Sequence, residues 1–193
     1  MGGSAGHGQV DDRAGGNSFA ILRLPPACSL PAMPAEARFE ITTRLAAPAA
    51  KVYAEALTPD GINHELGPWL RMTMPSSIKP GMTIDDPPLG EKLGRSWILL
   101  ARVIPVDFDD LSLAERGPGL RFLERSQLGS ARSWEHEREV VATGGATCAI
   151  TDRLRFEPRA PLRVIGGASI AQRIIARLFR HRHARLVERW GSA

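Results

Sequence analysis

Five ionisable side chains lie on faces of the predicted strands and of the last predicted helix that are otherwise apolar. They are Glu124, His136, Arg138, Asp152 and Arg182. Because side chains alternate between the two faces of a strand, Glu124 shares a face with Phe122, and Arg138 and His136 share one with Trp134. A buried charge is costly unless it is paired. We therefore predict that the five groups meet in one polar cluster.

The turn between the last two predicted strands indicates how two of these groups meet. Gly144 and Gly145 end one strand and precede the next, and a tight turn sets the register of the strands that flank it. Antiparallel pairing across this turn places Asp152 opposite Arg138 or His136, depending on the register.

The cluster leaves three interpretations open. Arg182, within the apolar stripe of the last helix, is placed to reach Glu124 or Asp152, so the groups could be structural ion pairs that join helix to sheet. They could instead orient the polar end of a bound ligand. A carboxylate beside His136 could also transfer protons, as in a cyclase or a dehydratase.

Motifs for a metal or a cofactor are missing from the sequence. The histidines and cysteines do not have the spacing of a metal site, and no segment matches a phosphate-binding glycine loop or a Ser/His/Asp signature. We therefore expect no metal and no cofactor, and we assign no catalytic residue.

Large apolar side chains on the same predicted faces are the expected lining of a cavity. Ligand pockets are mostly apolar with a few polar anchors, and Met and Trp adapt well to apolar ligands. The expected lining residues are Trp69, Met72, Met74, Trp97, Leu99, Phe122, Trp134, Ile175 and Phe179.

The elements that carry these residues follow one another as a strand, two short helices, a run of strands and one long helix. Residues 38–45 alternate polar and apolar, as a half-buried strand does. Pro48 opens a helix that runs to about residue 57, and Thr58 and Pro59 are the N-cap and first residue of a second helix. Further strands are predicted at 69–74, 96–104, 108–116, 120–127, 131–142 and 147–158.

After Pro161 the apolar residues recur with the period of a helix, which predicts about 25 helical residues. Its apolar stripe consists of Ala171, Ile175, Leu178, Phe179, Arg182 and Leu186. Because a sheet must bury its apolar face, we expect the helices to cover one side of an antiparallel sheet in an α+β fold.

Length and composition bound the class of protein. The 193 residues suggest one domain at 36–193 that follows a flexible Gly-, Ala- and Pro-rich extension at 1–35. The net charge is +4, but much of the excess positive charge lies on the last helix, which is more typical of a solvated face than of nucleic-acid binding.

No apolar run approaches the roughly 20 residues of a membrane span. The two isolated cysteines, Cys28 and Cys148, favour the cytoplasm.

The order of elements and several local motifs resemble the SRPBCC (START/Bet v 1-like) superfamily between about Phe39 and Trp190. The resemblance lies in residues 61–66, 70–73, 95–100, 122–126, 134–138, 151–154 and 178–183. It implies a helix-grip fold, in which a curved antiparallel sheet with two short helices grips a long C-terminal helix. It also implies a cavity between sheet and helix. No catalytic residue set is common to the superfamily, so none is carried over.

Three functions remain as hypotheses. The first is binding of a small apolar or aromatic molecule in the cavity, and the second is a polyketide cyclase- or dehydratase-like reaction there. The third is a module with a filled core that binds a partner through its surface. The size of the cavity distinguishes the third hypothesis from the first two. The sequence leaves the oligomeric state open.

Overall fold

A computed structural model describes residues 36–84, 86–159 and 167–193. The extension expected at 1–35, with Cys28, lies outside the described residues.

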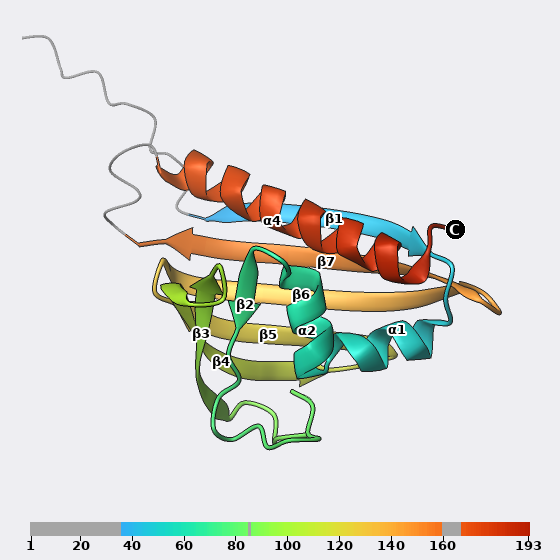
Figure 1. The fold of residues 1–193 in the computed structure, drawn as a ribbon, viewed down its shortest axis with the longest axis horizontal. Helices are drawn as coiled ribbons and strands as arrows, with labels where there is room; N and C mark the ends of the chain where they lie inside the picture. The colour runs from blue at the N-terminus through green and yellow to red at the C-terminus, as the bar shows by residue number, and fades with distance from the viewer. Residues whose placement is uncertain (1–35, 85, 160–166) are drawn as a thin grey trace, which may run out of the picture. The chain divides into compact units, whose positions relative to one another are not determined.

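Seven antiparallel strands form one curved sheet in the order β1-β7-β6-β5-β4-β3-β2 (Figure 1). The strands are β1 (Ala37–Leu45), β2 (Leu70–Met72), β3 (Lys92–Leu100), β4 (Ile104–Arg116), β5 (Leu120–Leu128), β6 (Ala131–Gly144) and β7 (Thr147–Pro158). Consecutive strands from β2 to β7 are neighbours, and β1 closes the far edge by pairing with β7. The sheet is therefore a meander, apart from the first strand.

Two short helices, α1 (Ala49–Ala56) and α2 (Pro59–Leu66), connect β1 to β2. The hydroxyl of Thr58 accepts a hydrogen bond from the Gly61 N–H at 2.9 Å, and Pro59 occupies the first turn of α2. This is the cap that the sequence predicts, because a Thr oxygen satisfies a free N–H and proline needs none.

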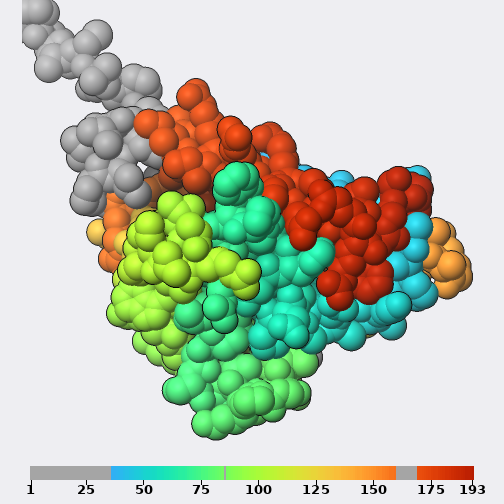
Figure 2. Space-filling model, viewed as in Figure 1, coloured from blue at the N-terminus to red at the C-terminus, as the bar shows by residue number. Residues whose placement is uncertain are grey.

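The long helix α4 (Gly167–Trp190) lies on the same side of the sheet as α1 and α2 (Figure 1). Phe179 and Leu186 of the predicted stripe are buried, and so is Ala176, which the predicted stripe did not include. In the space-filling view, α4, α2 and the residues around the β3–β4 turn cover this side (Figure 2). The helix-grip α+β fold is thus confirmed.

The strand predictions fail most clearly around residue 101. The strand expected at 96–104 is instead β3, which begins at Lys92 and ends at Leu100, and a turn follows before β4. Ala101 and Arg102 in this turn have φ angles of 49° and 68°. A tight hairpin turn requires positive φ, and no glycine marks the place, so the sequence gives little warning of it.

Candidate functional site

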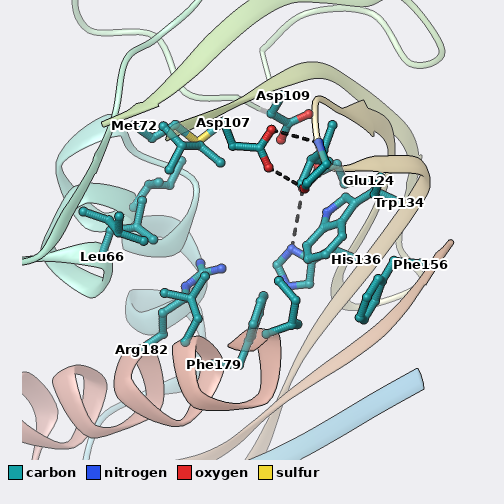
Figure 3. A pocket seen from close by; sticks show the side chains of 18 of the residues that line it. Leu66, Met72, Asp107, Asp109, Glu124, Trp134, His136, Phe156, Phe179 and Arg182 are labelled. Carbon is teal, nitrogen blue, oxygen red and sulfur yellow. Dashed lines mark hydrogen bonds and ion pairs between the residues drawn. The ribbon is translucent and has the colours of Figure 1, made fainter. Parts of the chain in front are cut away.

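A cavity of about 520 Å³ lies between the sheet and α4 (Figure 3). Its lining is mostly apolar and comes from α2, from β2 to β7 and from α4, with Leu66, Met72, Phe122, Trp134 and Phe179 among its members. The volume is within the range of roughly 300–1,000 Å³ that is usual for small-molecule pockets. Beside it lies a set of linked ionisable side chains, which we call the polar wall: Glu65, Glu124, His136, Arg138, Asp152 and Arg182.

Arg138 is the centre of that wall. Its side chain is 1% exposed and donates two hydrogen bonds to Asp152, both of 2.7 Å. Two further bonds, of 2.6 and 2.9 Å, go to Glu65. Arg138 and Asp152 are direct partners in the β6–β7 register, which is one of the two pairings that the alternation and the glycine turn allow. Two buried carboxylates are therefore held by one guanidinium.

The second arginine of the wall, Arg182, reaches from α4 to Glu65. Its Nε and Nη2 lie 2.9 and 2.8 Å from the same Glu65 oxygen. The expectation that Arg182 pairs with Glu124 or Asp152 is therefore wrong. The reason is that α2 packs against α4 and brings Glu65 closer to the guanidinium than either strand carboxylate.

His136 lies between Asp152 and Glu124 and contacts both. Its Nε2 lies 3.0 Å from Asp152 Oδ1, and its Nδ1 lies 3.6 Å from Glu124 Oε2. Burial acts to lower the pKa of His136, but the charge of Asp152 and hydrogen bonds to both carboxylates outweigh it, so the pKa is raised. His136 thus carries positive charge more readily than a free histidine does.

Paired carboxylates in this wall have pKa values shifted downward. Burial acts to raise the pKa of Asp152 and of Glu65, but the charge of Arg138 outweighs it in both, and the pKa of Asp152 falls well below its usual range. The pKa of Glu124 is also lowered, because hydrogen bonding to His136 outweighs burial. All three groups are therefore carboxylates at neutral pH.

Asp109 on β4 behaves in the opposite way. Burial raises its pKa well above the usual range, and the nearby Glu124 carboxylate raises it further. Its side chain lines the cavity. The groups that shift its pKa include carboxylates and a hydroxyl but no cation. The nearby Ser126 hydroxyl donates a hydrogen bond of 2.8 Å to Oε1 of Glu124.

Most of the predicted site residues meet in this cavity. The ones that line it are Met72, Met74, Phe122, Glu124, Trp134, His136, Arg138, Ile175, Phe179 and Arg182. Asp152 is fully buried behind Arg138 and His136 and does not line the cavity itself.

Trp69, Trp97 and Leu99 do not line the cavity, against our prediction. Trp69 is 66% exposed just before the short strand β2. The Trp97 ring packs edge-on against Phe108, 5.9 Å between centroids, on the outer side of the sheet. Ile98, the neighbour of Trp97, turns inward instead. The prediction placed β3 on the wrong face, and a register irregularity between Ile98 and Leu99 makes the alternation harder to follow.

Three residues of the site were not part of the predicted cluster. Glu65 lies in an eight-residue helix, too short for its buried side to be recognised. His183 lies on α4, where its Nε2 is 3.0 Å from Asp152 Oδ2 and its Nδ1 is 2.8 Å from the Thr43 hydroxyl. Asp109 was not recognised because the adjacent residue is also an aspartate, and one of two neighbouring aspartates must face outward. The outward one is Asp110, which pairs with Arg95. The spacing of Asp109 from Leu111 and Leu113, on one face of β4, was the available signal.

Within the described residues, no three His, Cys, Asp or Glu side chains are grouped in a way that could hold a metal ion. None of the described helices is long and apolar enough to cross a membrane. Among the described cysteines, Cys148 is buried in β7 as a free thiol.

Comparison with known proteins identifies a family and a fold. Residues 43–190 match the model of a family described as a domain of unknown function, DUF8410. No curated protein matches the chain significantly.

Solved structures match the chain at low sequence identity. A START superfamily protein from Mycobacterium smegmatis has a TM-score of 0.55 and 11% identity, covering 79% of this chain and 96% of its own. The Zhui aromatase/cyclase from Streptomyces sp. R1128 has a TM-score of 0.59 and 11% identity, over 80% and 93%. Protein CV1439 from Chromobacterium violaceum has a TM-score of 0.59 and 14% identity, over 83% and 100%. These matches confirm the START-like (SRPBCC) fold and show nothing finer.

Proposed function

The chain belongs to the DUF8410 family, and from its cavity we propose that it binds a small apolar or aromatic molecule between the sheet and α4. The cavity itself carries the proposal, because its lining is mainly apolar and unfilled by side chains. An apolar ligand that enters such a space gains roughly 25 cal/mol for each Å² of apolar surface removed from water.

The rim of the cavity supports entry from the side of α4. Val106, Ile170 and Ile174 line the cavity and are nevertheless about half exposed or more, at 52%, 48% and 61%. Large apolar side chains in water at the edge of an apolar cavity are typical of a ligand entrance.

The polar wall supports a ligand with a polar end. Glu124, His136 and Arg182 line the cavity in fixed positions, because each is held by another buried group. Fixed polar groups in an apolar pocket orient a ligand. The residues behind them, Arg138 and Asp152, then act mainly as supports.

The hypothesis of a module with a filled core is not proposed further, because it requires an interior without a cavity.

We also infer a cytoplasmic location, for which the free thiol of Cys148 is the support.

A proton-transfer enzyme of the cyclase or dehydratase kind is the second candidate. The observation that favours it is the Glu124–His136 pair in the cavity lining, with Asp109, a carboxyl whose pKa is raised by burial, beside it. One solved structure of this fold is named an aromatase/cyclase, but at 11% identity that likeness concerns the fold alone. Exchange of the α-protons of 4-phenyl-2-butanone in D₂O, followed by NMR, tests this candidate. Catalysed exchange that is lost in Glu124→Gln would support it, and exchange at the buffer rate would count against it.

Titration with the neutral fluorescent probe N-phenyl-1-naphthylamine tests the binding function. Ala171 on α4 lines the cavity, so Ala171→Trp should fill part of it and weaken binding of the probe. Ala184 is an exposed residue of the same helix, and Ala184→Trp is the matched control. We expect saturable binding that is at least about tenfold weaker in Ala171→Trp and unchanged in Ala184→Trp, since a tenfold change needs only 1.4 kcal/mol. Equal binding by both variants would refute the cavity as the site.

A further inference from the structure

Three carboxyl groups gather at the β4–β5 end of the cavity. Asp107 and Asp109 come from β4 and Glu124 from β5, and all three line the cavity (Figure 3). Asp109 is 6% exposed, and its Oδ1 has no hydrogen-bond partner among the residues that the structure describes. A buried oxygen without a donor is unusual and calls for one. The terminal torsion of an aspartate is broad, so the carboxyl can turn this oxygen toward a ligand.

The cationic side chains near these carboxyls already have other carboxylate partners. His136, on β6, lies between Glu124 and Asp152 and is shared by both. Arg182, on α4, is bound to Glu65.

Asp107 accepts hydrogen bonds from the backbone and hydroxyl of Ser130, which are neutral donors. The carboxyls at this end therefore outnumber the cations that face them. Burial and the carboxylates of Glu124 and Asp107 raise the pKa of Asp109, so Asp109 holds its proton more readily than a free aspartate and offsets part of this excess.

We infer that this acidic end of the cavity binds the protonated amine of a ligand whose apolar body occupies the remaining space. The inference rests on the proposed binding function and adds the chemical class of the polar end. An ammonium N–H would donate to Asp109 and supply the missing positive charge. Asp109 would then release its proton to solvent, so one proton leaves for each ligand bound and no covalent bond changes in the ligand.

Three probes with one body and different ends test the inference: 4-phenylbutylamine, 4-phenylbutanol and 4-phenylbutyrate. Each is used to displace N-phenyl-1-naphthylamine from the full chain. We expect the amine to bind about tenfold or more tighter than the alcohol, since hydrogen bonds between charged groups are the strong ones. We expect the carboxylate to bind weakest. The affinity for the amine should rise by up to about tenfold per pH unit while free Asp109 is protonated.

Asp109→Asn is the decisive variant, and Asp110→Asn is its control. The change is the same at adjacent residues, but Asp110 faces outward and pairs with Arg95. Asp109→Asn should bring the amine to the level of the alcohol and abolish the pH dependence, while Asp110→Asn should leave both unchanged.

The outcomes separate the two proposals. If the neutral probe binds but the wild-type protein prefers the alcohol or treats both equally, the amine inference is wrong and the binding function stands. An amine preference that persists in Asp109→Asn also overturns the inference. If the neutral probe itself does not bind, the proposed function fails, and the inference fails with it.

Discussion

Replacement of Arg138 by Met should cost the protein about 3–5 kcal/mol of unfolding free energy, the usual loss when one partner of a buried ion pair is removed. Arg138 is 1% exposed and makes four hydrogen bonds of 2.6 to 2.9 Å to Glu65 and Asp152. Met preserves much of the volume, so the loss would come from two buried carboxylates deprived of their shared cation.

The two carboxylates keep other partners, which limit the loss of unfolding free energy. Glu65 keeps Arg182, and Asp152 keeps His136 and His183. Since a domain has only about 5–15 kcal/mol of stability in total, Arg138→Met should leave the protein marginally folded. The double variant Arg138→Met/Asp152→Asn should lose less than the sum of its single variants, because it no longer buries the unpaired Asp152 charge.

Urea unfolding followed by tryptophan fluorescence and far-UV circular dichroism measures the loss, with an unchanged m-value as the sign of a pure stability effect. Arg153→Met is the control. Arg153 pairs with Glu137 and Glu139 on the outer side of the sheet, where its side chain is 42% exposed, so about 0–1 kcal/mol is expected. If Arg138→Met costs no more than Arg153→Met, the charges of the wall are not buried as described.

Three further predictions follow from the same contacts. Asp109 has a raised pKa in the folded state, so its contribution to stability is present below its unfolded pKa and declines as the pH rises. Asp109→Asn should therefore gain stability relative to the wild type as the pH rises above about 4, and urea unfolding that shows a constant difference would contradict this. The NMR-detected pKa of His136 should lie above that of a free histidine and fall in Asp152→Asn, and an unaltered pKa would count against the pairing. Gly61→Ala should cost about 1–3 kcal/mol in thermal or urea unfolding, because its Cβ would lie 2.0 Å from the Glu55 carbonyl oxygen, and a neutral effect would show that α1 and α2 can separate.

Local rules were enough for the parts of the site that lie on long, regular strands. That Asp152 would lie opposite Arg138 or His136 follows from alternation and from the glycine turn, because a hairpin register is a local property, and the observed register selects Arg138. The start of α2 follows from Thr58 and Pro59 for the same reason. Charges on an apolar face also indicated correctly that the groups would be buried together.

Tertiary packing decided what the sequence could not indicate. Glu65 belongs to the wall because the packing of α2 brings it to Arg138 on β6 and to Arg182 on α4, which are 73 and 117 residues away in the chain. Trp97 faces outward because the pairing of β3 with β4 sets its side, and large apolar side chains occur on both faces of that strand. The cavity itself is a property of the assembled layers, and composition gives no measure of its volume.

Native mass spectrometry of the full chain, purified without added ligand and then mixed with the neutral probe N-phenyl-1-naphthylamine, tests the central claim most directly. We predict a one-to-one complex, formed either with a co-purified small molecule or with the added probe, whose abundance falls sharply in Ala171→Trp and not in Ala184→Trp. A bare chain under all of these conditions, or a complex equally abundant in both variants, would contradict a ligand in the cavity.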